Sequence, residues 1–115
     1  MAEIYLLAAE ADVYLTGGTN ANRYINVVRE RAGATKYNGA VDIQYILDER
    51  ARELAGESTR WFDLKRTGKL TEDYLKQTNP DIGQYFLNST HTVRPIPQSF
   101  TDIIENGVDY QNPNY

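Results

Sequence analysis

The sequence contains no cysteine, one tryptophan and one histidine, His91. Without cysteine there are no disulfide bonds and no cysteine-ligated metals. The absence does not indicate the cellular compartment, because a domain of this size needs no covalent cross-links. His91 has no acidic neighbour within several residues, so it is not part of a metal-ligand pattern, and we expect it on the surface. The composition therefore indicates no metal and no cofactor.

Long apolar runs and basic clusters are also missing. No stretch approaches the roughly 20 apolar residues that span a bilayer, and the start Met1-Ala2-Glu3 lacks the basic and apolar regions of a secretion signal. The formal net charge is −4 without a basic patch, which argues against nucleic acid as a partner. Taken alone, these absences predict a cytoplasmic protein.

Helical periodicity dominates the first part of the chain. We expect helices over residues 2–16 and 20–32, joined by a glycine-rich turn and packed as an antiparallel hairpin of the tetratricopeptide kind. The apolar stripe of the first helix is Ile4, Leu7, Ala8, Ala11 and Leu15. The same helix carries Leu6 and Val13 on another side, and one hairpin cannot cover both. We therefore expect an apolar surface patch or self-association through this helix.

The rest of the chain divides into a helical stretch and an irregular tail. A third helix is expected from a cap at Asp42 to about residue 55, a fourth from residue 58 or 59 to before Gly68, and a short one near 71–77. From Asn79 onward a Pro/Asn-rich segment should coat the helices, with at most a short strand pair around 92–96. The predicted fold is a mainly α single domain over residues 1–115.

Arg50 lies on the apolar stripe of the third helix, where a solvated arginine is not expected. Leaving it unpaired in the core would cost about 3–5 kcal/mol, so a carboxylate from Glu53, Glu57 or Asp63 should pair with it. Together with Arg60, these residues form a predicted structural network.

A catalytic interpretation of the same segment is weaker. Glu49, Glu53 and Glu57 recur every four residues, which on a helix gives carboxylates about 5–6 Å apart, near the separation in retaining glycosidases. Gly56 interrupts this stack, and neighbouring arginines neutralise it. We therefore expect ion pairs here and no enzymatic activity.

Tyrosine is abundant, with nine residues in the chain. Aromatic faces stack on the apolar side of sugar rings, so tyrosines in the less regular second half are candidate glycan-binding residues. Tyr74, Tyr85, Tyr110 and Tyr115 lie in this half, and the candidates among them are Tyr74, Tyr85 and Tyr110. The alternative is that each is a core or interface anchor with a solvated hydroxyl.

Four motifs, in order, resemble the SusD/RagB-like family. Glu49-Arg50, Glu53-Leu54, Gly56-Glu57 and the run from Arg60 to Gly68 resemble its "ER..EL..GE..RW.DL.RTG" signature. Residues 2–11 resemble its "AE.LL..AEA" helix, and residues 27–33 its "vR.RAG" helix end. The close also fits, with Arg94-Pro95-Ile96-Pro97 and then residues 111–115. The resemblance covers nearly the whole chain, but members are several times longer, so it implies a C-terminal region.

The resemblance implies a non-enzymatic, glycan-binding outer-membrane lipoprotein that works with a SusC-like TonB-dependent transporter. Its lipid anchor would lie on an N-terminal part that this chain does not include. The signature resembles a fold-holding motif, so no sugar-binding residue is transferred from the family. Ser58 departs from it, because glycine or cysteine is common there. The alternative is a free-standing helical-repeat domain that binds a peptide or another protein.

Overall fold

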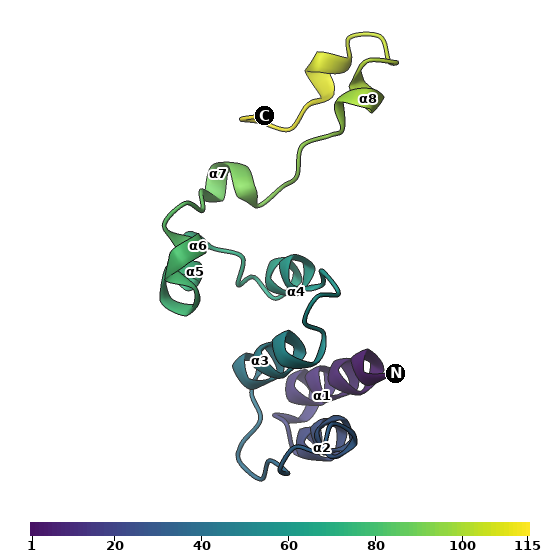
Figure 1. The fold of residues 1–115 in the computed structure, drawn as a ribbon, viewed down its shortest axis with the longest axis vertical. Helices are drawn as coiled ribbons and strands as arrows, with labels where there is room; N and C mark the ends of the chain where they lie inside the picture. The colour runs from purple at the N-terminus through teal and green to yellow at the C-terminus, as the bar shows by residue number, and fades with distance from the viewer. The chain divides into compact units, whose positions relative to one another are not determined.

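The computed structural model describes all 115 residues and is mainly α-helical, with eight α-helices, one 3-10 helix and no strand (Figure 1). The mainly α prediction is confirmed, but the short strand pair does not form. None of the helices has the length and apolar content needed to cross a bilayer. The chain divides into two compact units, Met1–Asp63 and Leu64–Tyr115.

The first unit contains three principal helices, which begin and end close to the predicted positions. They are α1 (Ala2–Thr16), α2 (Ala21–Arg31) and α3 (Ile43–Glu53). Gly17 ends α1 in the left-handed conformation (φ 75°) that favours glycine. Asp42 begins α3, because its carboxylate accepts the backbone N–H of Tyr45 at 2.7 Å and satisfies a donor that the first helical turn leaves free.

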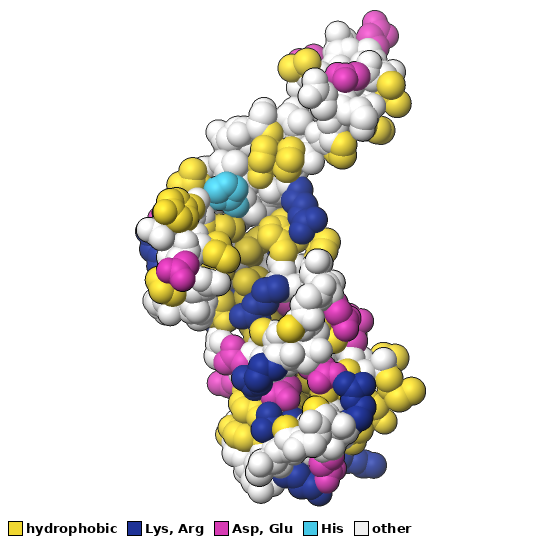
Figure 2. Space-filling model, in the orientation of Figure 1, with side chains coloured by type: hydrophobic (Ala, Val, Ile, Leu, Met, Phe, Trp, Pro, Cys, Tyr) yellow, Lys and Arg dark blue, Asp and Glu magenta, His cyan; other side chains and the backbone are white.

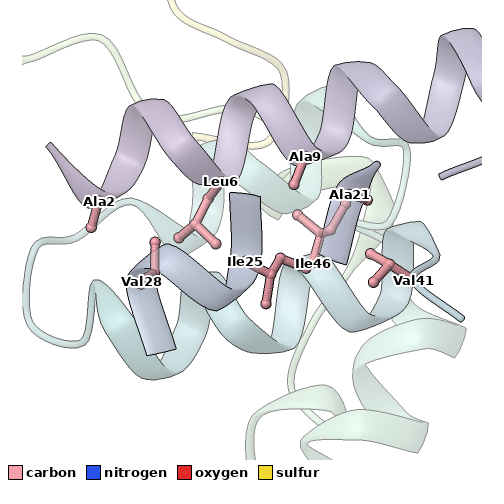
Figure 3. Packing of buried hydrophobic residues seen from close by; sticks show 8 residues of the cluster. All are labelled: Ala2, Leu6, Ala9, Ala21, Ile25, Val28, Val41 and Ile46. Carbon is pink, nitrogen blue, oxygen red and sulfur yellow. The ribbon is translucent and has the colours of Figure 1, made fainter. Parts of the chain in front are cut away.

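The core of this unit lies where α1 packs on α2 and α3. Figure 3 shows Ala2 beside Val28 and Ala9 beside Ala21, so α1 and α2 run antiparallel as expected. Leu6, Ile25 and Ile46 are fully buried among them, and each contributes about 1.5–3 kcal/mol through the apolar surface it removes from water. The tetratricopeptide character of the hairpin stays a prediction.

The apolar stripe of α1 is not the face that packs. Ile4 is 69% exposed and Leu15 is 83% exposed, whereas Leu6 is fully buried and Glu10, expected off the apolar stripe, is also buried. Leu6 is flanked on its face by the small residues Ala2 and Ala9, which let the neighbouring helices approach closely. The helix is apolar on two sides, and the side of Ala2, Leu6 and Ala9 forms the core.

The second unit consists of short helices. They are α5 (Glu72–Thr78), α6 (Pro80–Gly83), α7 (Asn88–His91), α8 (Gln98–Thr101) and the 3-10 helix η1 (Gly107–Tyr110), and α4 (Arg60–Arg66) spans the boundary between the units. A Cβ on Gly83 would lie 2.4 Å from the backbone nitrogen of Lys76, so α6 packs directly on α5. Similarly, η1 contacts α8.

Side-chain amides hold the tail in the region where at most a short strand pair was expected. Gln111 accepts the backbone N–H of Ile96 at 2.8 Å and donates to its carbonyl at 3.0 Å, while Asn112 donates to the carbonyl of Arg94 at 2.6 Å. Pro95 and Pro97 have no N–H to offer a ladder, and Gln111 occupies both backbone groups of the residue between them. Gln111 and Asn112 thus occupy both backbone groups of Ile96 and the carbonyl of Arg94, which a strand pair would otherwise use.

Candidate functional site

Arg50 is the most buried charged side chain of α3, with 2% of its surface exposed. The helix places it beside Ile46, Leu47 and Leu54, and α4 supplies its partner: the Arg50 Nε donates to the Asp63 carboxylate at 2.8 Å. Asp63 is also buried. The Arg50 Nη2 is 3.5 Å from the half-exposed Glu3 carboxylate on α1, a much weaker contact. The Arg50–Asp63 pair is therefore the buried ion pair that joins α3 to α4.

A second set of ion pairs surrounds Glu49. Its carboxylate accepts from Arg29 on α2 at 2.9 Å and from Arg52 at 2.5 Å. The hydrogen bond to Glu49 raises the pKa of Arg52, because it stabilises the charged guanidinium. Glu53 pairs in the same way with Arg31 of α2. Figure 2 shows acidic and basic side chains interspersed over the first unit. The pairs of Glu49 with Arg29 and of Glu53 with Arg31 connect α3 to α2.

The structure brings together only some of the predicted network residues. Arg50 lies beside Asp63, whereas Glu53 pairs with α2 and Arg60 donates to the carbonyl of Leu47 at 2.7 Å. Glu57 is exposed beyond the end of α3, and its side chain makes no ion pair. Sequence reasoning missed Arg29, for which only the resemblance of residues 27–33 to a family motif gave a signal.

The end of α3 decides whether Glu49, Glu53 and Glu57 line up as a row of carboxylates. Helix α3 ends at Glu53, and Gly56 has a φ of 85°, so Glu57 does not continue the helical spacing. A hollow of about 280 Å³ lies beside Arg50, lined mainly by residues 54–60, and Asp63 is the one carboxylate in its lining. Since Asp63 is tied to Arg50, the hollow lacks the two carboxyl groups that glycoside hydrolysis uses.

The three candidate tyrosines occupy separate places in the second unit. Tyr85 is 73% exposed and lines a hollow of about 250 Å³ with Ile82, Phe86 and His91. Tyr110 is 62% exposed on η1, and the ring of Tyr74 faces the Lys69 ammonium at 5.6 Å. Neither Tyr74 nor Tyr110 lines the hollow of Tyr85, so the three do not form a common platform.

His91 is half-buried rather than at the open surface, and its Nδ1 accepts the backbone N–H of Leu87 at 2.9 Å. This bond closes the turn at α7 in the manner of a capping side chain. The role visible for His91 is therefore local and structural.

Another hollow, of about 250 Å³, lies between α8 and η1 and contains the ring of Tyr115, one of the tyrosines noted in the second half of the sequence. Its lining is Gln98, Thr101, Asp102, Val108, Gln111 and Tyr115. Here an aromatic face and polar side chains converge, which is the usual composition of a small-molecule site. No local pattern marks it, because Tyr115 reaches the hollow through contacts with residues more than 20 positions away.

Comparison with known proteins decides the family. The family model described as the SusD family matches residues 1–115, the whole chain. The chain belongs to the SusD family.

Two curated proteins of the SusD family are similar to it. A SusD-like protein of Formosa agariphila is 47% identical over 110 residues, which cover 84% of this chain and 20% of that protein. The starch-binding protein SusD of Bacteroides thetaiotaomicron is 42% identical over 122 residues, covering 100% of this chain and 20% of that protein. The chain thus spans about a fifth of the length of these relatives. No solved structure was found to match it.

Proposed function

We propose that this chain is part of a glycan-binding protein that captures carbohydrate for nutrient uptake at the cell surface. The observation that carries the proposal is the match to the SusD family along the whole chain, together with 42% identity to a protein named for starch binding. Starch and its oligosaccharides are therefore the first ligands to test.

The proposed protein is held at the outer membrane by a lipid anchor and passes its ligand to a SusC-like TonB-dependent transporter. Both features follow from the resemblance of residues 49–68 and of the first helix to SusD/RagB-like proteins. Both features would belong to a full-length protein. The two curated relatives are about five times longer than this chain.

Binding without hydrolysis is the proposed activity. Glu49 and Glu53 are each engaged by arginines, and Asp63 is tied to Arg50. A general acid or nucleophile must be free to exchange a proton or attack a sugar carbon, and these three carboxylates are committed to ion pairs. Their arrangement supports a role in holding α2, α3 and α4 together.

Co-sedimentation with starch granules tests ligand class, and membrane fractionation tests location. The protein encoded by the whole reading frame that contains this sequence should pellet with granular starch and be released by added maltooligosaccharide. The same protein should fractionate with the outer membrane and co-purify with a TonB-dependent transporter. If the protein encoded by the whole reading frame is found in the soluble cytosolic fraction and co-purifies with no TonB-dependent transporter, the proposal is contradicted. That result supports the alternative of a helical-repeat interaction domain.

A further inference from the structure

We propose that the hollow between α8 and η1, which we call the Tyr115 hollow, binds one sugar ring of a neutral glycan. The inference rests on the proposed function for the ligand class, but the site itself is argued from its own residues. Its lining combines one aromatic ring, one aliphatic side chain and several polar groups. Figure 1 shows α8 and the C-terminal segment that carry these residues.

The ring of Tyr115 is a fixed, half-exposed platform. Its face is available because the residue is 47% exposed, while its hydroxyl is anchored inside the unit: it lies 3.2 Å from the carbonyl oxygen of Thr90 and 3.0 Å from that of Val93. A ring held by its hydroxyl loses little freedom when a ligand stacks on it, so less of the interaction energy is spent on ordering. The apolar C–H face of a sugar is suited to such a surface.

Polar groups for the sugar hydroxyls lie in the same lining. The Gln98 amide and the Asp102 carboxylate are exposed and make no hydrogen bond within the chain. The Gln111 amide, in contrast, is occupied by Ile96, so it holds the wall of the hollow in place. One carboxylate acceptor and one amide, each free to bond, match the alternating donors and acceptors on the rim of a sugar.

Charge selects a neutral sugar. Asp102 is the one charged residue in the lining, and neither lysine nor arginine lines the hollow. A uronate, sulfated or phosphorylated sugar would place a second negative charge near the Asp102 carboxylate with no cation to balance it. The hydroxyls of a neutral hexose, in contrast, donate to that carboxylate.

The size of this hollow limits its ligand, and its composition separates it from the hollow at Tyr85. A volume of about 250 Å³ is below the range of about 300–1,000 Å³ for sites that enclose drug-sized ligands, so it suits a single ring rather than an oligosaccharide. The Tyr85 hollow is as large but is lined by Ile82, Phe86, Tyr85 and His91, and it has no carboxylate or amide. Its polar groups are the Tyr85 hydroxyl and the His91 imidazole, whose Nδ1 already accepts the Leu87 N–H, so it offers fewer partners to the hydroxyl rim of a sugar.

The test is a titration of the chain with maltose, followed by amide chemical shifts in ¹⁵N-labelled protein. We expect saturable shifts centred on Gln98, Asp102 and Tyr115, with a dissociation constant of about a millimolar for a contact of one ring. Tyr115→Ala and Asp102→Ala should each weaken binding about tenfold. Tyr110→Ala is the matched control, since it removes an exposed tyrosine from η1 that does not line the hollow, and it should leave the affinity within about twofold.

The Asp102→Ala variant keeps the site testable if Tyr115→Ala unfolds, and a charged sugar tests the ligand class. Asp102→Ala removes a side chain without internal hydrogen bonds, so it keeps the site testable if Tyr115→Ala loosens the tail. Glucuronate should bind at least several-fold more weakly than maltose; equal binding overturns the charge argument. Shifts that cluster elsewhere, or binding unaffected by both variants, overturn the site.

Absence of saturable shifts also overturns the inference, and the starch co-sedimentation then separates the two proposals. If the full-length protein still binds starch, the Tyr115 hollow alone is refuted. If the full-length protein also fails to bind, the proposed function fails with it.

Discussion

Replacing Arg50 with methionine should destabilise the first unit strongly. The substitution keeps an apolar stem of similar length on α3 but leaves the Asp63 carboxylate buried without the guanidinium that lies 2.8 Å away. Both side chains of this pair are at most 4% exposed, so water cannot replace the lost partner. Breaking a buried pair on one side costs about 3–5 kcal/mol, a large part of the 5–15 kcal/mol that stabilises a typical domain.

The assay is urea unfolding followed by the fluorescence of Trp61, which lies two residues from Asp63 on α4. With a urea dependence of about 1–3 kcal/mol per molar, the midpoint should fall by about 2 M in Arg50→Met. The double variant Arg50→Met with Asp63→Leu removes both charges and should recover most of this loss. As a control, Glu30→Gln breaks an exposed pair with Lys36 and should cost about 0.5 kcal/mol or less. A loss below about 1 kcal/mol in Arg50→Met would show that the buried Arg50–Asp63 pair is not needed for stability, as would a double variant no more stable than the single one.

Other predictions concern packing. Leu6→Ala should cost about 2–5 kcal/mol because the side chain is fully buried, whereas Leu15→Ala, on the exposed side of the same helix, should change the unfolding free energy by less than about 0.5 kcal/mol and reduce the self-association measured by light scattering. Asp42→Ala should cost about 1 kcal/mol in urea unfolding by removing the cap of α3. In Gly107→Ala, the new Cβ would lie 1.7 Å from the carbonyl oxygen of Thr101, so we expect η1 to move away from α8, seen as loss of nuclear Overhauser contacts between them.

The parts of the fold that depend on local chemistry were predictable from the sequence. The cap at Asp42 and the break at Gly17 act within one turn of chain, so the helices begin and end near their expected positions. The position of Arg50 on an apolar stripe indicated burial and a carboxylate partner, because a buried unpaired charge is costly. The structure places it beside Asp63, one of the three carboxylates considered.

What depends on distant contacts was not predictable. Helix α1 has two apolar sides, and only the packing of α2 and α3 decides which one is buried. At most a short strand pair was expected in the tail, and none forms, because Gln111 takes the backbone groups of Ile96 from 15 positions away. Tyr115 likewise becomes a platform only through its contacts with Thr90 and Val93. No periodicity in the sequence predicts these contacts, because they join residues that are far apart in the chain.

The most direct test of the account is calorimetric titration of the full-length protein with maltoheptaose, combined with an assay for new reducing ends in the same sample. We expect saturable binding with no increase in reducing ends over hours, because the proposed activity is glycan binding without cleavage. Release of reducing ends would contradict the proposed binding without hydrolysis. Absence of binding to maltoheptaose and to every other neutral glycan in a panel would contradict glycan capture itself.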